Sequence, residues 1–393
     1  MNETNIRMPH RPENPLIVAG ILLELRRISI GGLAVQIIAA IFLGLSWNWV
    51  AALQWILQAG LIWVLVLYET NRHLPLNCKS PGTAMYPHLG VANRLTITRG
   101  WLIAATGGFL FQEYPPGVVA LVPAVLYAIS AIIDRIDGYA ARRSGQVSRM
   151  GAELDTVFDA LGLAVAPLLA VWYGKIHWTY LSVSAAYYVF QLGLCYRRRK
   201  GLPVVKLKPK LSRRAIAGFQ MGFIAIVLFP VFEPPATRIA AFVLMLPVLG
   251  GFLLDWFSVI GRISEHSRIN QTTLKRGESL IGAVFQPSVR LLLAAAIMLW
   301  MFRSPLSIAS PLPANPLSLY IILACGGLIL LGILGRVFAL VLVLLLGWHY
   351  TMHLPGVLDS VLLSATLWIL VLGQGCFSLC SWDEAWVNRY DGA

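Results

Sequence analysis

The dominant pattern along the chain is a series of apolar runs separated by short polar loops. A helix that crosses a bilayer needs about 20 predominantly apolar residues. We expect twelve spans, at residues 30–45, 50–68, 95–110, 117–133, 152–171, 179–194, 215–229 and 239–260 and in four stretches beginning near Val289, Leu317, Val337 and Val357. The pattern predicts an all-α polytopic membrane helix bundle.

An earlier apolar run, residues 15–23, is too short to cross a membrane and is followed by Glu24, Arg26 and Arg27. We expect this run to form an amphipathic helix that lies at the membrane interface. It lacks a convincing cleavage site, so we expect no removed signal peptide.

Polar stretches divide the chain into segments. The predicted segments are a cytoplasmic or interfacial N-terminus (1–28), two extra spans (29–68), a polar linker (69–92), a six-span core (93–263), a cytoplasmic linker (264–283) and a four-span C-terminal region (284–393). The six-span segment fills less than half of the chain.

Charge supports this topology. Only 12% of residues are charged, about half the share in soluble domains, and the net charge of +13 comes from 31 Lys and Arg against 18 Asp and Glu. The basic residues gather in loops such as 197–214 and 264–276, whereas 232–237 and 304–315 carry none. The positive-inside rule then places both termini in the cytoplasm, and we expect the protein in the cell (inner) membrane. No nucleic-acid-binding pattern occurs.

Four aspartates carry the strongest chemical signal. Asp134 and Asp137 are three residues apart, and Asp155 and Asp159 are four apart, so each pair lies on one face of its helix. One pair ends a predicted span and the other begins the next, after a short basic turn. We expect the hairpin to bring all four carboxylates together near the cytoplasmic face.

Such a cluster needs a cation, because four carboxylates repel one another and are costly at membrane depth. Lys or Arg is one source of that charge; the other is a pair of divalent ions, since all-oxygen sites suit Mg²⁺ or Mn²⁺. Gly138, Ala141 and Gly151 leave the helix surfaces bare for a base or a diphosphate, and Arg142 offers a forked cation to a phosphate. The alternative is an ion-paired turn in which small residues serve helix packing.

The same residues form a longer motif, Asp134-x2-Asp137-Gly138-x2-Ala141-Arg142-x8-Gly151-x3-Asp155-x3-Asp159. This motif resembles the signature of the CDP-alcohol phosphatidyltransferase family, with every position and gap filled. Upstream, Asn93-x2-Thr96-x2-Arg99 resembles the start of that family's first core span.

The resemblance implies a role for each position. Asp134, Asp137 and Asp155 would hold two Mg²⁺ or Mn²⁺ ions, and Asp159 would be a further ligand and the general base. The cytidine diphosphate site would be lined by Gly138, Ala141, Arg142, Gly151, Asn93 and Thr96. The resemblance further implies a CDP-linked lipid donor, a small alcohol acceptor, surrounding membrane lipids and a homodimer.

The acceptor is open at this point. A basic belt at 197–214 includes Lys210, Arg213 and Arg214, which we interpret as candidate ligands for glycerol 3-phosphate; topology and lipid headgroups explain the belt equally well. Lys210, ten residues before Gln220, resembles a pattern in phosphatidylglycerophosphate synthases. Residues 159–167 instead resemble the corresponding helix of bacterial phosphatidylserine synthases, which implies serine as the acceptor.

Other functions stay possible. CDP-choline or CDP-ethanolamine is an alternative donor, with diacylglycerol as the acceptor. The C-terminal residues 335–340 and 373–379 resemble DoxX-type membrane proteins. Twelve spans also allow a transporter or a scaffold without catalysis, although the acidic motif is not repeated in the second half as transporter repeats would lead one to expect.

Overall fold

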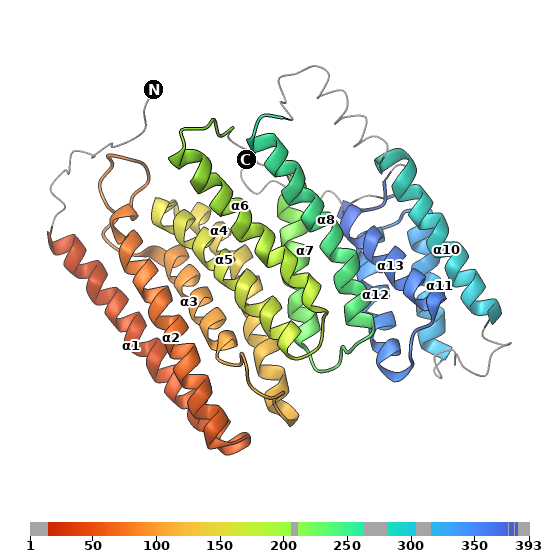
Figure 1. Ribbon diagram of the computed structural model, residues 1–393, viewed down its shortest axis with the longest axis horizontal. Helices are drawn as coiled ribbons and strands as arrows, with labels where there is room; N and C mark the ends of the chain where they lie inside the picture. Colours follow the sequence, from red (N-terminus) through yellow and green to blue (C-terminus); the bar gives the residue numbers. More distant parts are fainter. Residues whose placement is uncertain are drawn as a thin grey trace. The chain divides into compact units, whose positions relative to one another are not determined.

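The structure is a computed structural model that describes residues 15–205, 211–262, 281–303, 316–375, 377–380 and 382–383. Its long helices, labelled as in Figure 1, are α1 (Pro15–Ser46), α2 (Trp49–His73), α3 (Gly90–Gly107), α4 (Val122–Ser144), α5 (Arg149–Trp172), α6 (Leu181–Arg199), α7 (Leu211–Leu228), α8 (Ala236–Val259), α10 (Gln286–Arg303), α11 (Pro316–Leu331), α12 (Gly335–Met352) and α13 (Val357–Leu372). β pairing in the described residues is limited to two isolated bridges. The prediction of an all-α polytopic bundle is confirmed.

Within the part of the chain that the structure describes, six helical segments are long and apolar enough to cross a membrane: those containing α1, α2, α4, α5, α8 and α10. Shorter apolar helices coincide with α7, α11, α12 and α13. Large apolar side chains on α1 and α2, including Ile38, Leu45, Leu57 and Leu61, are exposed. So much apolar surface is unfavourable in water and favourable against lipid. The protein is a multi-pass membrane protein.

The described residues divide into two compact units. The first contains α1 to α5 and residues 224–229, and the second contains the remaining helices. In the first unit, α3 packs against α2, α4 and α5, and α1 packs against α2 (Figure 1). Two thirds of α3 is buried because its small residues, such as Gly100 and Ala104, let neighbouring helices approach closely.

The N-terminal part of α1 differs from the expectation. Instead of a separate short helix at 15–23, one continuous helix runs from Pro15 to Ser46. The carboxylate of Glu24 accepts hydrogen bonds from Arg94 Nε at 2.5 Å and from the Leu89 backbone N–H at 3.1 Å. These contacts compensate the charge that was expected to end the run, because a paired and hydrogen-bonded carboxylate costs less to bury.

The linker predicted at 69–92 is structured. α2 extends to His73, and the loop that follows is held by Asn77, whose Nδ2 donates to the His88 carbonyl at 3.0 Å and whose carbonyl accepts from the Tyr86 N–H at 2.8 Å. The predicted linker at 264–283 lies outside the described residues except for 281–283, and so do residues 1–14 of the predicted N-terminal segment.

Candidate active site

The acidic residues lie on a helical hairpin made by α4 and α5. Gly145 ends α4 with φ of +66°, a left-handed conformation that glycine adopts without steric cost. Ser148 begins α5, and its Oγ accepts a hydrogen bond from the Gly151 N–H at 3.0 Å, which is the usual role of an N-terminal capping serine. The tight turn directs the aspartates of the two helices toward each other.

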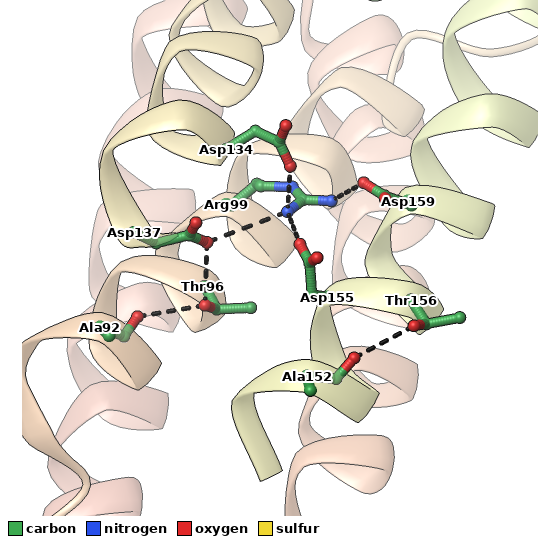
Figure 2. Close-up of polar contacts among 9 residues, drawn as sticks. All are labelled: Ala92, Thr96, Arg99, Asp134, Asp137, Ala152, Asp155, Thr156 and Asp159. Atoms are coloured by element: carbon green, nitrogen blue, oxygen red, sulfur yellow. Dashed lines mark hydrogen bonds and ion pairs between the residues drawn. The ribbon is translucent and has the colours of Figure 1, made fainter. Parts of the chain in front are cut away.

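A third helix, α3, completes the site. A Cβ atom at Gly100 would lie 2.7 Å from Val66 Cγ1 and 3.1 Å from Phe158 Cε2, so this glycine allows α3 to approach α2 and α5 closely. Thr96 and Arg99 are three residues apart and share one face of α3. That face is turned toward the aspartates of the hairpin (Figure 2).

Arg99 lies at the centre of the aspartate cluster (Figure 2). Its Nη1 is 2.6 Å from Oδ1 of Asp134, 2.6 Å from Oδ1 of Asp155 and 3.9 Å from Oδ2 of Asp137. Its Nη2 donates to Oδ1 of Asp159. Lys or Arg was one of the two sources of positive charge expected from the sequence, and the structure supplies Arg99.

Burial is graded across the cluster. The Arg99 side chain is fully buried and Asp137 is nearly so, whereas the side chains of Asp155 and Asp159 are each 48% exposed. Four carboxylates against one guanidinium give this group of residues a net charge of −3 when all are ionised. The site is therefore short of positive charge, and Asp155 and Asp159 form its accessible side.

The carboxylates fit a hard divalent cation. Asp134, Asp155 and Asp159 each offer an oxygen, and these oxygens lie within 4.8 Å of one another. Carboxylate oxygens are the ligands that Mg²⁺ and Mn²⁺ prefer. Asp137 lies beside this triad, and its Oδ2 accepts a hydrogen bond from Thr96 Oγ1 at 3.0 Å. The hairpin thus brings three of the predicted ligands together and holds the fourth next to them.

The two glycines predicted to line the nucleotide site have different surroundings. A Cβ at Gly138 would meet only Arg142 Nη1, at 3.4 Å, so this stretch of α4 presents an open surface together with Ala141. A Cβ at Gly151 would lie 2.7 Å from Asn93 Oδ1 and 3.2 Å from Ser148 Oγ. Gly151 is therefore at a close packing contact between α5 and α3.

Asn93 is buried and connects three segments. Its Oδ1 accepts from Ser148 Oγ at 3.0 Å, and its Nδ2 donates to Asn77 Oδ1 at 3.1 Å. Its amide therefore ties the 77–89 loop to the beginning of α5. The expected contacts of Asn93 and Thr96 with a nucleotide stay predictions, because the described bonds of both side chains are to other protein groups.

The side chains of the predicted acceptor residues lie outside the part of the chain that the structure describes. Lys210 lies outside the described residues, and Arg213 and Arg214 are described only as backbone in the first turn of α7.

Sequence reasoning missed three residues that build the site. Arg99 was noted as part of a motif without a role, and Asn77 and Ser148 were not singled out. A signal existed for Ser148, because serine directly before a helical run is a favoured N-terminal cap. Arg99 also carried a signal, since it is a charged residue within the membrane span predicted at 95–110, where ionisable groups are functional candidates. For Asn77 the sequence offers no local signal.

The part of the chain that contains the aspartates is similar to known proteins. The sequence model of the family described as CDP-alcohol phosphatidyltransferase matches residues 89–253, which contain α3, the α4–α5 hairpin and all four aspartates. Residues 89–253 are a CDP-alcohol phosphatidyltransferase domain. The four aspartates lie within this domain, and their roles stay predictions.

Curated relatives of the phosphatidyltransferase domain fall into two groups. A CDP-diacylglycerol–serine O-phosphatidyltransferase of Methanocaldococcus jannaschii is 50% identical over 42 residues, which cover 11% of this chain and 21% of the relative. The CDP-diacylglycerol–glycerol-3-phosphate 3-phosphatidyltransferase of Yersinia enterocolitica is 35% identical over 97 residues, or 24% of this chain and 52% of the relative. The chain thus spans between about a fifth and about half of the length of these relatives. No solved structure matches the chain.

Proposed function

We propose that this protein transfers the phosphatidyl group of CDP-diacylglycerol to the hydroxyl of glycerol 3-phosphate and releases CMP. The observation that carries the proposal is the aspartate triad within the phosphatidyltransferase domain, whose oxygens lie within 4.8 Å of one another on an accessible side of the hairpin. We place the reaction at the cytoplasmic face of the cell membrane, where the positive-inside rule puts the basic loops.

Each side chain of the site has a proposed task. Asp134, Asp137, Asp155 and Asp159 would hold a pair of Mg²⁺ or Mn²⁺ ions, which when bound neutralise the diphosphate and the departing phosphate. The open α4 surface at Gly138 and Ala141 would receive the cytidine diphosphate. Arg142, which is exposed beside Gly138, would donate two parallel hydrogen bonds to a phosphate.

Asp159 is the proposed general base, because it is among the most exposed carboxylates of the cluster. Its carboxylate takes the proton of the acceptor hydroxyl. The hydroxyl oxygen forms a bond to the phosphorus that carries the diacylglycerol. The bond from that phosphorus to the bridging oxygen breaks, and CMP leaves with the electron pair.

Two observations favour glycerol 3-phosphate as the acceptor: the basic belt at 197–214, whose charge suits a phosphorylated alcohol, and the relatives named for that acceptor. Serine is the second candidate. It is favoured by the relatives named as serine O-phosphatidyltransferases and by the sequence at 159–167. The names of both groups of relatives give CDP-diacylglycerol as the donor.

An acceptor assay separates the two candidates. Purified full-length protein in detergent is supplied with CDP-diacylglycerol and Mg²⁺ or Mn²⁺, and with glycerol 3-phosphate, serine or inositol phosphate in separate reactions. Mass spectrometry identifies the lipid product. We expect phosphatidylglycerophosphate; formation of phosphatidylserine alone would replace the acceptor, and no phosphatidyl transfer to any of them would contradict the proposal.

A further inference from the structure

The proposed reaction gives no task to Arg99, although this side chain contacts more aspartates than any other cation in the described site. Its guanidinium is fully buried and forms ion pairs with Asp134, Asp155 and Asp159. These are the residues whose oxygens are grouped closely enough to hold a divalent cation. The same three carboxylates thus pair with the Arg99 guanidinium and form the candidate site for a divalent metal ion.

The guanidinium and a divalent ion compete for the same oxygens. Nη1 is 2.6 Å from Oδ1 of both Asp134 and Asp155, so it lies between these two oxygens. Mg²⁺ binds oxygens at about 2.1 Å, so two oxygens on one ion are at most about 4.2 Å apart. An ion bound by this pair would therefore occupy nearly the position of Nη1, where the positive charges also repel each other.

The side chain of Arg99 is held by little else. Within the described residues, its buried Nε has no hydrogen-bond partner, so the guanidinium is retained through its two terminal nitrogens and the carboxylates. Asp137 lies outside the triad, and its Oδ2, 3.9 Å from Nη1, is close enough to keep the guanidinium paired after a small rotation, while Oδ1 of Asp137 is left for the proposed metal pair. A divalent ion in the triad would displace Arg99, and Asp137 is the nearby carboxylate with which Arg99 can then pair.

We propose that Arg99 is an exchangeable counter-ion: it holds the three aspartates together before a divalent cation binds, and it yields their oxygens when the cation arrives. The inference rests on the proposed function for the nature of that cation. Arg99 is a positioning residue in this account, because it acts through the carboxylates. Exchange also prepares Asp159, whose Oδ1 is engaged by Arg99 beforehand and afterwards is free of that hydrogen bond.

Binding of Mn²⁺ to the full-length protein in detergent tests the exchange, with free Mn²⁺ followed by electron paramagnetic resonance after chelator treatment. Arg99→Met removes the charge and keeps a long apolar side chain. If Arg99 occupies the triad nine tenths of the time, its removal tightens the apparent Mn²⁺ affinity by about tenfold. We also expect Arg99→Met to unfold at a lower temperature than wild type without metal, and Mn²⁺ to raise its unfolding temperature more.

Arg94→Met is the matched control, because Arg94 lies on the same helix but pairs with Glu24 instead of the cluster. It should leave the Mn²⁺ affinity unchanged. Arg99→Lys serves if Arg99→Met does not fold, because lysine keeps the charge but loses the forked geometry; it should tighten Mn²⁺ binding by a smaller factor. Equal or weaker Mn²⁺ binding in the Arg99 variants, or no binding in any of the proteins, overturns the inference.

The result is separable from the proposed reaction, because Mn²⁺ binding needs no turnover. Tighter Mn²⁺ binding in Arg99→Met together with no phosphatidyl transfer by wild type would support the exchange and remove the proposed function. Unchanged Mn²⁺ affinity in Arg99→Met together with phosphatidyl transfer by wild type would do the reverse.

Discussion

Replacing each of the two motif glycines by alanine distinguishes substrate approach from packing. Gly138 and Gly151 are both fixed positions of the signature, yet the added methyl group meets different surroundings. At Gly138 the nearest atom is the end of the Arg142 side chain at 3.4 Å, an ordinary contact that a flexible side chain accommodates. Alanine is more favourable than glycine inside a helix by about 0.8–1 kcal/mol. Gly138→Ala should therefore stabilise the fold by about 0.5–1 kcal/mol.

At Gly151 the sign reverses. The methyl group would lie 2.7 Å from Asn93 Oδ1, so Asn93 must move. That movement disturbs its bonds to Ser148 and Asn77. The methyl group would also lie 3.2 Å from Ser148 Oγ, which caps α5. A lost helix cap costs about 0.5–2 kcal/mol, and a buried polar group without its partner costs about 1–3 kcal/mol. Against a helix gain of at most about 1 kcal/mol, Gly151→Ala should destabilise the fold by about 1–3 kcal/mol.

Both variants should lose activity for different reasons. The unfolding temperature in detergent, followed by tryptophan fluorescence, should rise by a few degrees for Gly138→Ala and fall for Gly151→Ala. CMP release should fall at least about tenfold in Gly138→Ala, because the methyl group occupies the surface proposed for the diphosphate; tenfold corresponds to about 1.4 kcal/mol of transition-state stabilisation. A stable Gly138→Ala protein with wild-type kcat/KM for the donor would refute this use of the α4 surface.

Three further changes test other parts of the account. Ser148→Ala removes the cap of α5 and should lower the free energy of unfolding by about 1 kcal/mol, seen as a lower unfolding temperature; an unchanged temperature would contradict the capping role. Thr96→Val removes the hydrogen bond to buried Asp137, so kcat should fall and the unfolding temperature should fall with it, because a buried group without its partner costs about 1–3 kcal/mol; wild-type kcat would exclude a positioning role. The third change replaces basic-belt residues by alanine, at Lys210, Arg213 and Arg214. It should raise KM for glycerol 3-phosphate and leave KM for the donor unchanged. A rise confined to the KM of the donor would instead assign the belt to lipid binding.

The hairpin was predictable because its signal is local. The spacings of Asp134 with Asp137 and of Asp155 with Asp159 fix one face on each helix, and the short turn between the helices leaves few ways to arrange them. Apolar run length likewise predicted the membrane bundle, since lipid imposes a minimum span.

Other features depend on contacts between distant residues, and a single sequence does not show these. Glu24 was expected to interrupt an apolar run, but its partner Arg94 is 70 residues away. The nucleotide contact expected of Asn93 stays a prediction, but its bonds to Asn77 and Ser148 could not be predicted, because these residues come from a loop and a turn that only folding brings together. The place of Arg99 depends on the packing of α3 against both arms of the hairpin.

The most direct test of the central claim is CMP release from CDP-diacylglycerol and glycerol 3-phosphate by wild type and by Asp159→Asn. The substitution keeps the shape of the side chain and removes its ability to take a proton. We predict metal-dependent CMP release by wild type, and a loss of at least about a hundredfold in an Asp159→Asn protein that is still folded and still binds the donor. Wild-type turnover by folded Asp159→Asn, or no CMP release by wild type with any acceptor, would contradict the account.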